Sequence, residues 1–187
     1  MPSFFLALLF TVIASIGGRD QRLVAGLSAR LGSSMNLLVV GWIASAVTAS
    51  TAAGAGFLMA RLLPPDAKTM LVAFALLAAG LEMLLLHGRK LPYEPTRSLV
   101  AIFLVLVAQQ IGDGARFLIL VVAISTGNPV LAAIGGAVGG GLALAIGWAG
   151  RGETYARLPL RLIRRSVASA LIVIGVVIGL YARGILV

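Results

Sequence analysis

Two similar polar segments, 95 residues apart, each lie inside a long apolar stretch of this sequence. Residues 15–21 read Ser-Ile-Gly-Gly-Arg-Asp-Gln, and residues 110–116 read Gln-Ile-Gly-Asp-Gly-Ala-Arg. Charged side chains within an apolar span are costly to bury, so they usually mark a transport path or an ion site. A duplicated site of this kind is typical of secondary transporters that are built from two structural repeats.

The composition predicts an all-α integral membrane protein, because 60% of the residues are hydrophobic and only 11% are charged. Six apolar stretches are long enough, or nearly so, to cross the ~30 Å hydrocarbon core of a bilayer. We place these spans at residues 4–31, 36–60, 68–87, 97–125, 130–148 and 165–181. The first and fourth are longer than a straight crossing needs. We expect them to break at their central glycines, which are Gly17 and Gly18 in the first and Gly112 and Gly114 in the fourth.

Each half of the chain carries three spans, so the second half enters the membrane from the opposite side. We therefore predict two inverted three-helix repeats, residues 1–90 and 91–187, within a single membrane domain. Nine basic residues belong to the side of loops one, three and five, and three belong to the opposite side. This bias predicts that the odd-numbered loops are cytoplasmic and that both termini lie outside. The nine are Arg30, Arg89, Lys90, Arg97, Arg151, Arg157, Arg161, Arg164 and Arg165, and the three are Arg61, Lys68 and Arg183.

Both polar segments resemble the doubled Glu-x-Gly-Asp-(Lys/Arg)-(Ser/Thr) motif of the transmembrane-protein-165 kind of cation exchangers. These are Golgi calcium/manganese–proton exchangers with manganese-exporting relatives in bacteria. The resemblance extends over two three-span repeats, a central loop and the Gly-Asn-Pro turn at residues 127–129. It implies that acidic residues of both motifs meet at the centre and bind a divalent cation. It also implies a multi-pass protein of a bacterial inner membrane.

The sequence departs from this motif at its acidic positions. Ser15 and Gly18 stand where the first motif has Glu and Asp, and Gln110 stands where the second has Glu. Asp113 is the one motif carboxylate that remains in register. Asp20 lies two places after Gly18 and could partly replace the missing aspartate if the helix unwinds at the glycines.

The first hypothesis is a secondary transporter of Mn²⁺ or Ca²⁺, coupled to protons, with a central site between spans one and four. Both ions prefer oxygen ligands, and carboxylates offset the cost of dehydrating a doubly charged ion. The predicted ligands are Asp113 and Asp20 as metal-binding carboxylates, with Gln110, Gln21 and Ser15 as neutral oxygen donors. This hypothesis requires that Arg19, Arg22 and Arg116 point away from the ion.

Two alternatives follow from the same charges. In one, the protein is a transport-inactive structural or accessory protein, in which arginines replace the bound cation. Arg19 or Arg22 would then pair with Asp113, and Arg116 would pair with Asp20. In the other, the surplus positive charge at the N-termini of the broken helices forms an anion site, and the protein is an anion transporter.

The sequence offers no set of residues typical of an enzyme, and its basic residues follow membrane topology, so neither catalysis nor nucleic-acid binding is predicted. No resident cofactor is expected. The expected partners are the lipid bilayer, the transported cation with protons, and a second copy or a paralogue. Glu82, a little over one turn inside the end of the third span, is interpreted as an interfacial residue that pairs with Arg89 or Lys90.

Overall fold

The computed structural model describes residues 1–86, 97–150 and 159–185. Eight helices and no strand occur in these ranges. The helices are α1 (Pro2–Ser15), α2 (Arg19–Leu31), α3 (Met35–Leu62), α4 (Pro65–Leu85), α5 (Leu99–Ile111), α6 (Gly114–Thr126), α7 (Pro129–Gly150) and α9 (Leu160–Ala182). The expectation of an all-helical protein is therefore confirmed for the described part of the chain.

Four of these helices, α3, α4, α7 and α9, are each long and apolar enough to cross a bilayer. The pairs α1–α2 and α5–α6 pass the same test together, but they bend by 64° and 60° at their breaks. The chain thus has four candidate membrane spans, or up to six if each bent pair counts as one span. A multi-pass membrane protein is the class that these helices support.

Local sequence explains where most helices begin and end. The Ser34 hydroxyl accepts a hydrogen bond from the Leu37 N–H at the start of α3, and Ser98 does the same for Ala101 at the start of α5. Gly127 adopts the left-handed conformation that commonly ends a helix, and it closes α6. The last helix begins five residues earlier than the sixth predicted span, because it starts directly after Pro159.

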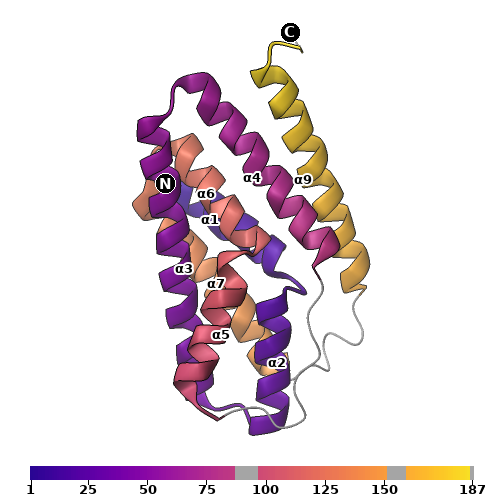
Figure 1. Cartoon of the computed structure of the whole chain (residues 1–187). Coiled ribbons are helices and arrows are strands. Elements are labelled where there is room, and N and C mark those ends of the chain that lie inside the picture. Colours follow the sequence, from indigo (N-terminus) through magenta and orange to yellow (C-terminus); the bar gives the residue numbers. More distant parts are fainter. Residues whose placement is uncertain (87–96, 151–158, 186–187) are drawn as a thin grey trace.

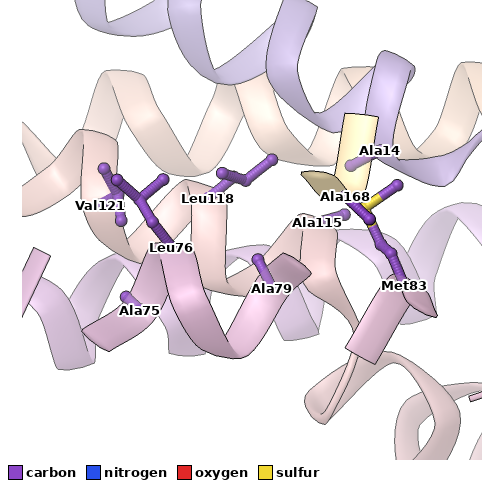
Figure 2. Close-up of a cluster of buried hydrophobic side chains, with 9 residues drawn as sticks. All are labelled: Ala14, Ala75, Leu76, Ala79, Met83, Ala115, Leu118, Val121 and Ala168. Atoms are coloured by element: carbon purple, nitrogen blue, oxygen red, sulfur yellow. The ribbon is translucent and has the colours of Figure 1, made fainter. Parts of the chain in front are cut away.

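Small residues let the central helices approach closely. In Figure 1, α4 and α9 run side by side, and both chain ends lie in the upper half of the view. Figure 2 shows a buried cluster in which four helices, α1, α4, α6 and α9, contribute mostly alanines. Its members are Ala14, Ala75, Leu76, Ala79, Met83, Ala115, Leu118, Val121 and Ala168. Close backbone approach is typical of helix packing in membranes, where small residues rather than apolar bulk form the interface.

The two bent pairs pack against each other unevenly. Helices α1 and α6, one from each bent pair, lie against each other, and α6 also packs on α4. The other two helices of these pairs, α2 and α5, make few contacts with each other. The two bent pairs therefore pack more closely through α1 and α6 than through α2 and α5, which instead pack on α7 and α3.

The contact between α4 and α9 gives the first prediction. A Cβ atom at Gly80 would lie 2.6 Å from Cγ1 of Ile172 and 2.8 Å from the carbonyl oxygen of Ala168. Gly80→Ala should therefore push the helices apart and lower the free energy of unfolding by about 1–3 kcal/mol. Thermal unfolding of the purified protein in detergent measures this loss. Gly54→Ala is the matched control, because nothing lies within 4 Å of a Cβ there, and equal unfolding temperatures would contradict the packing.

Candidate functional site

The first break separates α1 from α2 at Ile16, Gly17 and Gly18. Gly17 has a φ of +68°, a left-handed conformation that favours glycine. Its N–H donates a 2.7 Å hydrogen bond to Oε1 of Gln21, which ties the break to the first turn of α2. Since α1 has 14 residues, about 21 Å of helix precedes the break, which places it deep within a span.

The second break separates α5 from α6 at Gly112 and Asp113, so that α6 begins at Gly114. Asp113 occupies the N-cap position of α6, but its side chain makes no capping hydrogen bond. The Gly114 N–H instead donates a 3.2 Å hydrogen bond to Oε2 of Glu82, which comes from α4. A carboxylate from another helix thus satisfies the positive end of α6.

Glu82 is the carboxylate around which the positive groups gather. Its oxygens lie 3.2 Å from Nε of Arg19 and 3.6 Å from Nη2 of Arg164, and its side chain is only 3% exposed. The interpretation of Glu82 as an interfacial residue is therefore wrong. Its expected partners, Arg89 and Lys90, lie outside the described residues. Arg164, which the sequence suggests as a loop residue, is a buried residue of α9.

Arg19 also joins the two breaks. Its Nη2 donates hydrogen bonds to the carbonyl oxygens of Gln109, at 3.3 Å, and Gly112, at 3.2 Å. These carbonyls belong to the end of α5, where a helix carries partial negative charge. Arg19 therefore satisfies the end of one broken helix from the start of the other.

Asp20 and Gln110 meet across the predicted repeats. Nε2 of Gln110 donates a 3.0 Å hydrogen bond to Oδ2 of Asp20, and the Gln21 N–H donates at 2.7 Å to Oδ1. The Thr48 hydroxyl in turn donates to Oε1 of Gln110 at 2.9 Å. All four residues are buried, so the two predicted site residues Asp20 and Gln110 share one satisfied polar network.

Gln21 and Arg116, 95 residues apart, make corresponding contacts with α7 and α3. Nε2 of Gln21 donates to the carbonyl oxygen of Ala143 at 2.6 Å, and Nε of Arg116 donates to Oγ1 of Thr48 at 3.0 Å. Ala143 and Thr48 are themselves 95 residues apart. Each broken helix thus contacts an equivalent position on the long helix of the other half.

Asp113 lacks the hydrogen-bond partners that Asp20 and Glu82 have. It is 2% exposed, and within the described chain neither of its oxygens has a hydrogen-bond partner. The nearest cation is Nη1 of Arg116, at 3.9 Å from Oδ2. The hydroxyl of Ser15 is likewise buried and without a hydrogen-bond partner in this part of the chain. A buried, unsatisfied carboxylate is costly and calls for an explanation.

The cross-repeat pairs proposed for a transport-inactive protein differ from the contacts observed. Arg19 pairs with Glu82, and Arg116 lies beside Asp113 of its own half. Arg22 lines a pocket near the first break. Among the described residues, no group of three or more His, Cys, Asp and Glu side chains is placed to hold a metal ion. Asp20, Glu82 and Asp113 are the described carboxylates near the breaks, and Glu82 is already paired with arginines.

Glu82, Arg164 and Thr48 are the residues of this centre that the sequence interpretation missed. A signal for Glu82 is present, because it interrupts an otherwise apolar run from residue 70 to residue 86. A charge within a span is a functional-site hypothesis by default. Arg164 has the spacing to share a helix face with Arg161 and Leu160, but no sequence signal shows that this face is buried.

No protein-family model, curated protein or solved structure matches this chain. The resemblance to the cation exchangers stays a prediction from the sequence.

The role of Glu82 gives the second prediction. Glu82→Gln keeps the shape of the side chain but removes the charge that compensates Arg19 and Arg164. Because this leaves buried cations unpaired, we expect the free energy of unfolding to fall by on the order of 3 kcal/mol. The change can be followed in detergent through the fluorescence of the two tryptophans. Asp66→Asn, on the exposed first turn of the same helix, should leave unfolding unchanged; an equal effect of both variants would contradict this role.

Proposed function

We propose that this protein is a cation-coupled secondary transporter in which Asp113 binds the transported cation or proton. The observation that carries this proposal is the Asp113 carboxylate, which is buried beside a helix break and has no hydrogen-bond partner among the described residues. The nearest cation, Nη1 of Arg116, lies 3.9 Å from Oδ2, so an ionised Asp113 has one ion-pair partner but no hydrogen bond among the described residues. A proton or a metal ion would bind to these unsatisfied oxygens, and its release on either side of the membrane constitutes transport.

The proposed architecture is six spans arranged as two inverted three-helix repeats. Its support is that equivalent helices begin 95 residues apart, α2 and α6 at Arg19 and Gly114, and α4 and α9 at Pro65 and Leu160. The matched contacts of Gln21 and Arg116 support the same relation. In transporters of this kind, broken helices from both repeats meet near the midplane and form the substrate site.

The uneven packing of the broken helices supports an access route from one side. The half-helices α1 and α6 pack together, whereas α2 and α5 make few contacts with each other. One cavity, of about 560 Å³, lies between α4, α6 and α9 at the opposite end of the molecule. A second, of about 330 Å³, lies where α2 ends and α5 begins, and Leu31, Leu37 and Leu99 line it. This is the side that the basic residues predict to be cytoplasmic. If α2 and α5 came to pack together while α1 and α6 separated, the opposite side would open.

A proton is the simplest cargo for this site. One unpartnered carboxylate binds one proton, whereas Ca²⁺ or Mn²⁺ requires several oxygen ligands. The two oxygens of Asp20 already accept hydrogen bonds from Gln110 and Gln21. Mn²⁺ or Ca²⁺ is the second candidate. The buried hydroxyls of Ser15 and Thr11 on helix α1, which have no hydrogen-bond partner among the described residues, are neutral oxygen donors.

The competing function is that of a transport-inactive structural protein. It is supported by the ion pairs of Glu82, which join α2, α4 and α9 through buried charges as a purely structural network would. The two functions differ in what they require of Asp113. A transporter needs this carboxylate to bind and release its cargo, whereas the structural protein needs it to remain unchanged.

Flux through proteoliposomes tests the proposal. Asp113→Asn keeps an N-cap side chain but cannot exchange a proton, so proton flux and any coupled Mn²⁺ or Ca²⁺ flux should fall to the level of protein-free vesicles. Asp66→Asn, at an exposed position, should transport at the wild-type rate. Saturable flux that Asp113→Asn leaves intact, or the lack of any flux in folded wild-type protein, would contradict the proposal.

A further inference from the structure

Five arginines line one pocket at the junction of α2, α4 and α9. They come from the start of α2 and the start of α9, and the apolar end of α4 closes the pocket with Met83, Leu84 and Leu86. The arginines are Arg19, Arg22, Arg161, Arg164 and Arg165. Glu82 pairs with Arg19 and Arg164, and Arg161 and Arg165 are exposed.

The N-termini of two helices meet at this pocket. A Cβ atom at Gly17, directly before α2, would lie 3.4 Å from Cβ of Leu160 and 3.5 Å from Cδ of Arg164, at the start of α9. The N-terminus of a helix carries partial positive charge and unsatisfied N–H groups. The pocket therefore combines two positive helix ends with positive side chains.

The arginines of α9 lie at the unfavourable end of their helix. Arg161, Arg164 and Arg165 occupy its first two turns, and its first turn has no acidic residue to offset them. Cations stabilise a helix near its C-terminus and destabilise it near its N-terminus. Arg164 is also more than nine-tenths buried, and its Nη1 has no hydrogen-bond partner within the described chain. An anion at the mouth of the pocket would place negative charge near this buried guanidinium and near both helix ends.

We propose that this arginine pocket binds the phosphate group of an anionic ligand. Guanidinium groups match the oxygens of a phosphate group in a bidentate manner, and helix N-termini bind such groups through backbone N–H donors. The enclosed space is only about 20 Å³, so the phosphate group sits at the mouth, where Arg161 and Arg165 are exposed. Its source is either a soluble phosphate compound, which the proposed carrier would then transport together with its cation, or a lipid headgroup. The first of these sources rests on the proposed transport function, and the binding site itself does not.

Titration of the full-length protein with inorganic phosphate tests the site. In nanodiscs of phosphatidylcholine, isothermal titration calorimetry should show saturable binding to the wild type. The double variant Arg161→Gln/Arg165→Gln should bind at least about tenfold more weakly, because it loses two charge-assisted contacts but keeps Glu82 and its partners. Arg183→Gln is the matched control, since it removes an exposed arginine at the opposite end of the same helix, and it should bind like the wild type.

A second arm identifies a lipid as the source. Native mass spectrometry of protein from nanodiscs that contain phosphatidylglycerol should show a retained anionic lipid, which the double variant loses and Arg183→Gln keeps. The site is supported if the double variant alone loses phosphate binding, or if it alone loses the retained lipid. If the double variant binds phosphate and retains lipid as the wild type does, the proposal is overturned. Asp113→Asn should bind normally in both arms, so loss of transport and loss of this site are distinguished.

Discussion

The compensation of positive charge by Glu82 is the interaction on which the centre of this protein depends. Its carboxylate faces Arg19 from α2, Arg164 from α9 and the first N–H of α6 at Gly114. Two broken helices cannot place their positive N-termini together in an apolar medium unless negative charge lies between them. Glu82 supplies that charge from a third helix, and it thereby allows the two breaks to adjoin.

Glu82 also pairs with arginines that could otherwise pair with Asp113. Arg19 is held by Glu82 and by two carbonyls of the α5 end, so it does not serve as the counterion of Asp113. Asp20 differs, since both of its oxygens accept hydrogen bonds from neighbouring donors. Of the two carboxylates that the sequence singles out, Asp20 is a satisfied member of the network, whereas Asp113 has Arg116 at 3.9 Å and no hydrogen bond among the described residues.

Sequence patterns predicted the features that depend on local chemistry. The first break falls at Gly17, whose positive φ favours glycine, and the second at Gly112, whose φ of −98° is open to other residues. Polar residues around both breaks are buried neighbours, as with Asp20 and Gln110. The partners of Glu82 could not be predicted in this way. Pairing between α2, α4 and α9 depends on how three distant helices pack, and a single sequence does not contain that information. The positive-inside rule counts basic residues near the end of a span whether they lie in a loop or in a helix. It therefore gave no sign that Arg164 belongs to α9 rather than to the preceding loop.

The accessibility of the second break to water tests the account most directly. The chain has no cysteine, and a Cβ atom at Gly112 meets nothing within 4 Å, so Gly112→Cys introduces one thiol beside Asp113 with little disturbance. Leu104→Cys, on an exposed apolar position of the same helix α5, is the lipid-facing control. A transport function predicts that a membrane-impermeant thiol reagent modifies Gly112→Cys from the side where α2 ends and α5 begins, and leaves Leu104→Cys unmodified. Equal protection of both thiols from both sides would show that no aqueous path reaches the second break, and it would contradict a transport function.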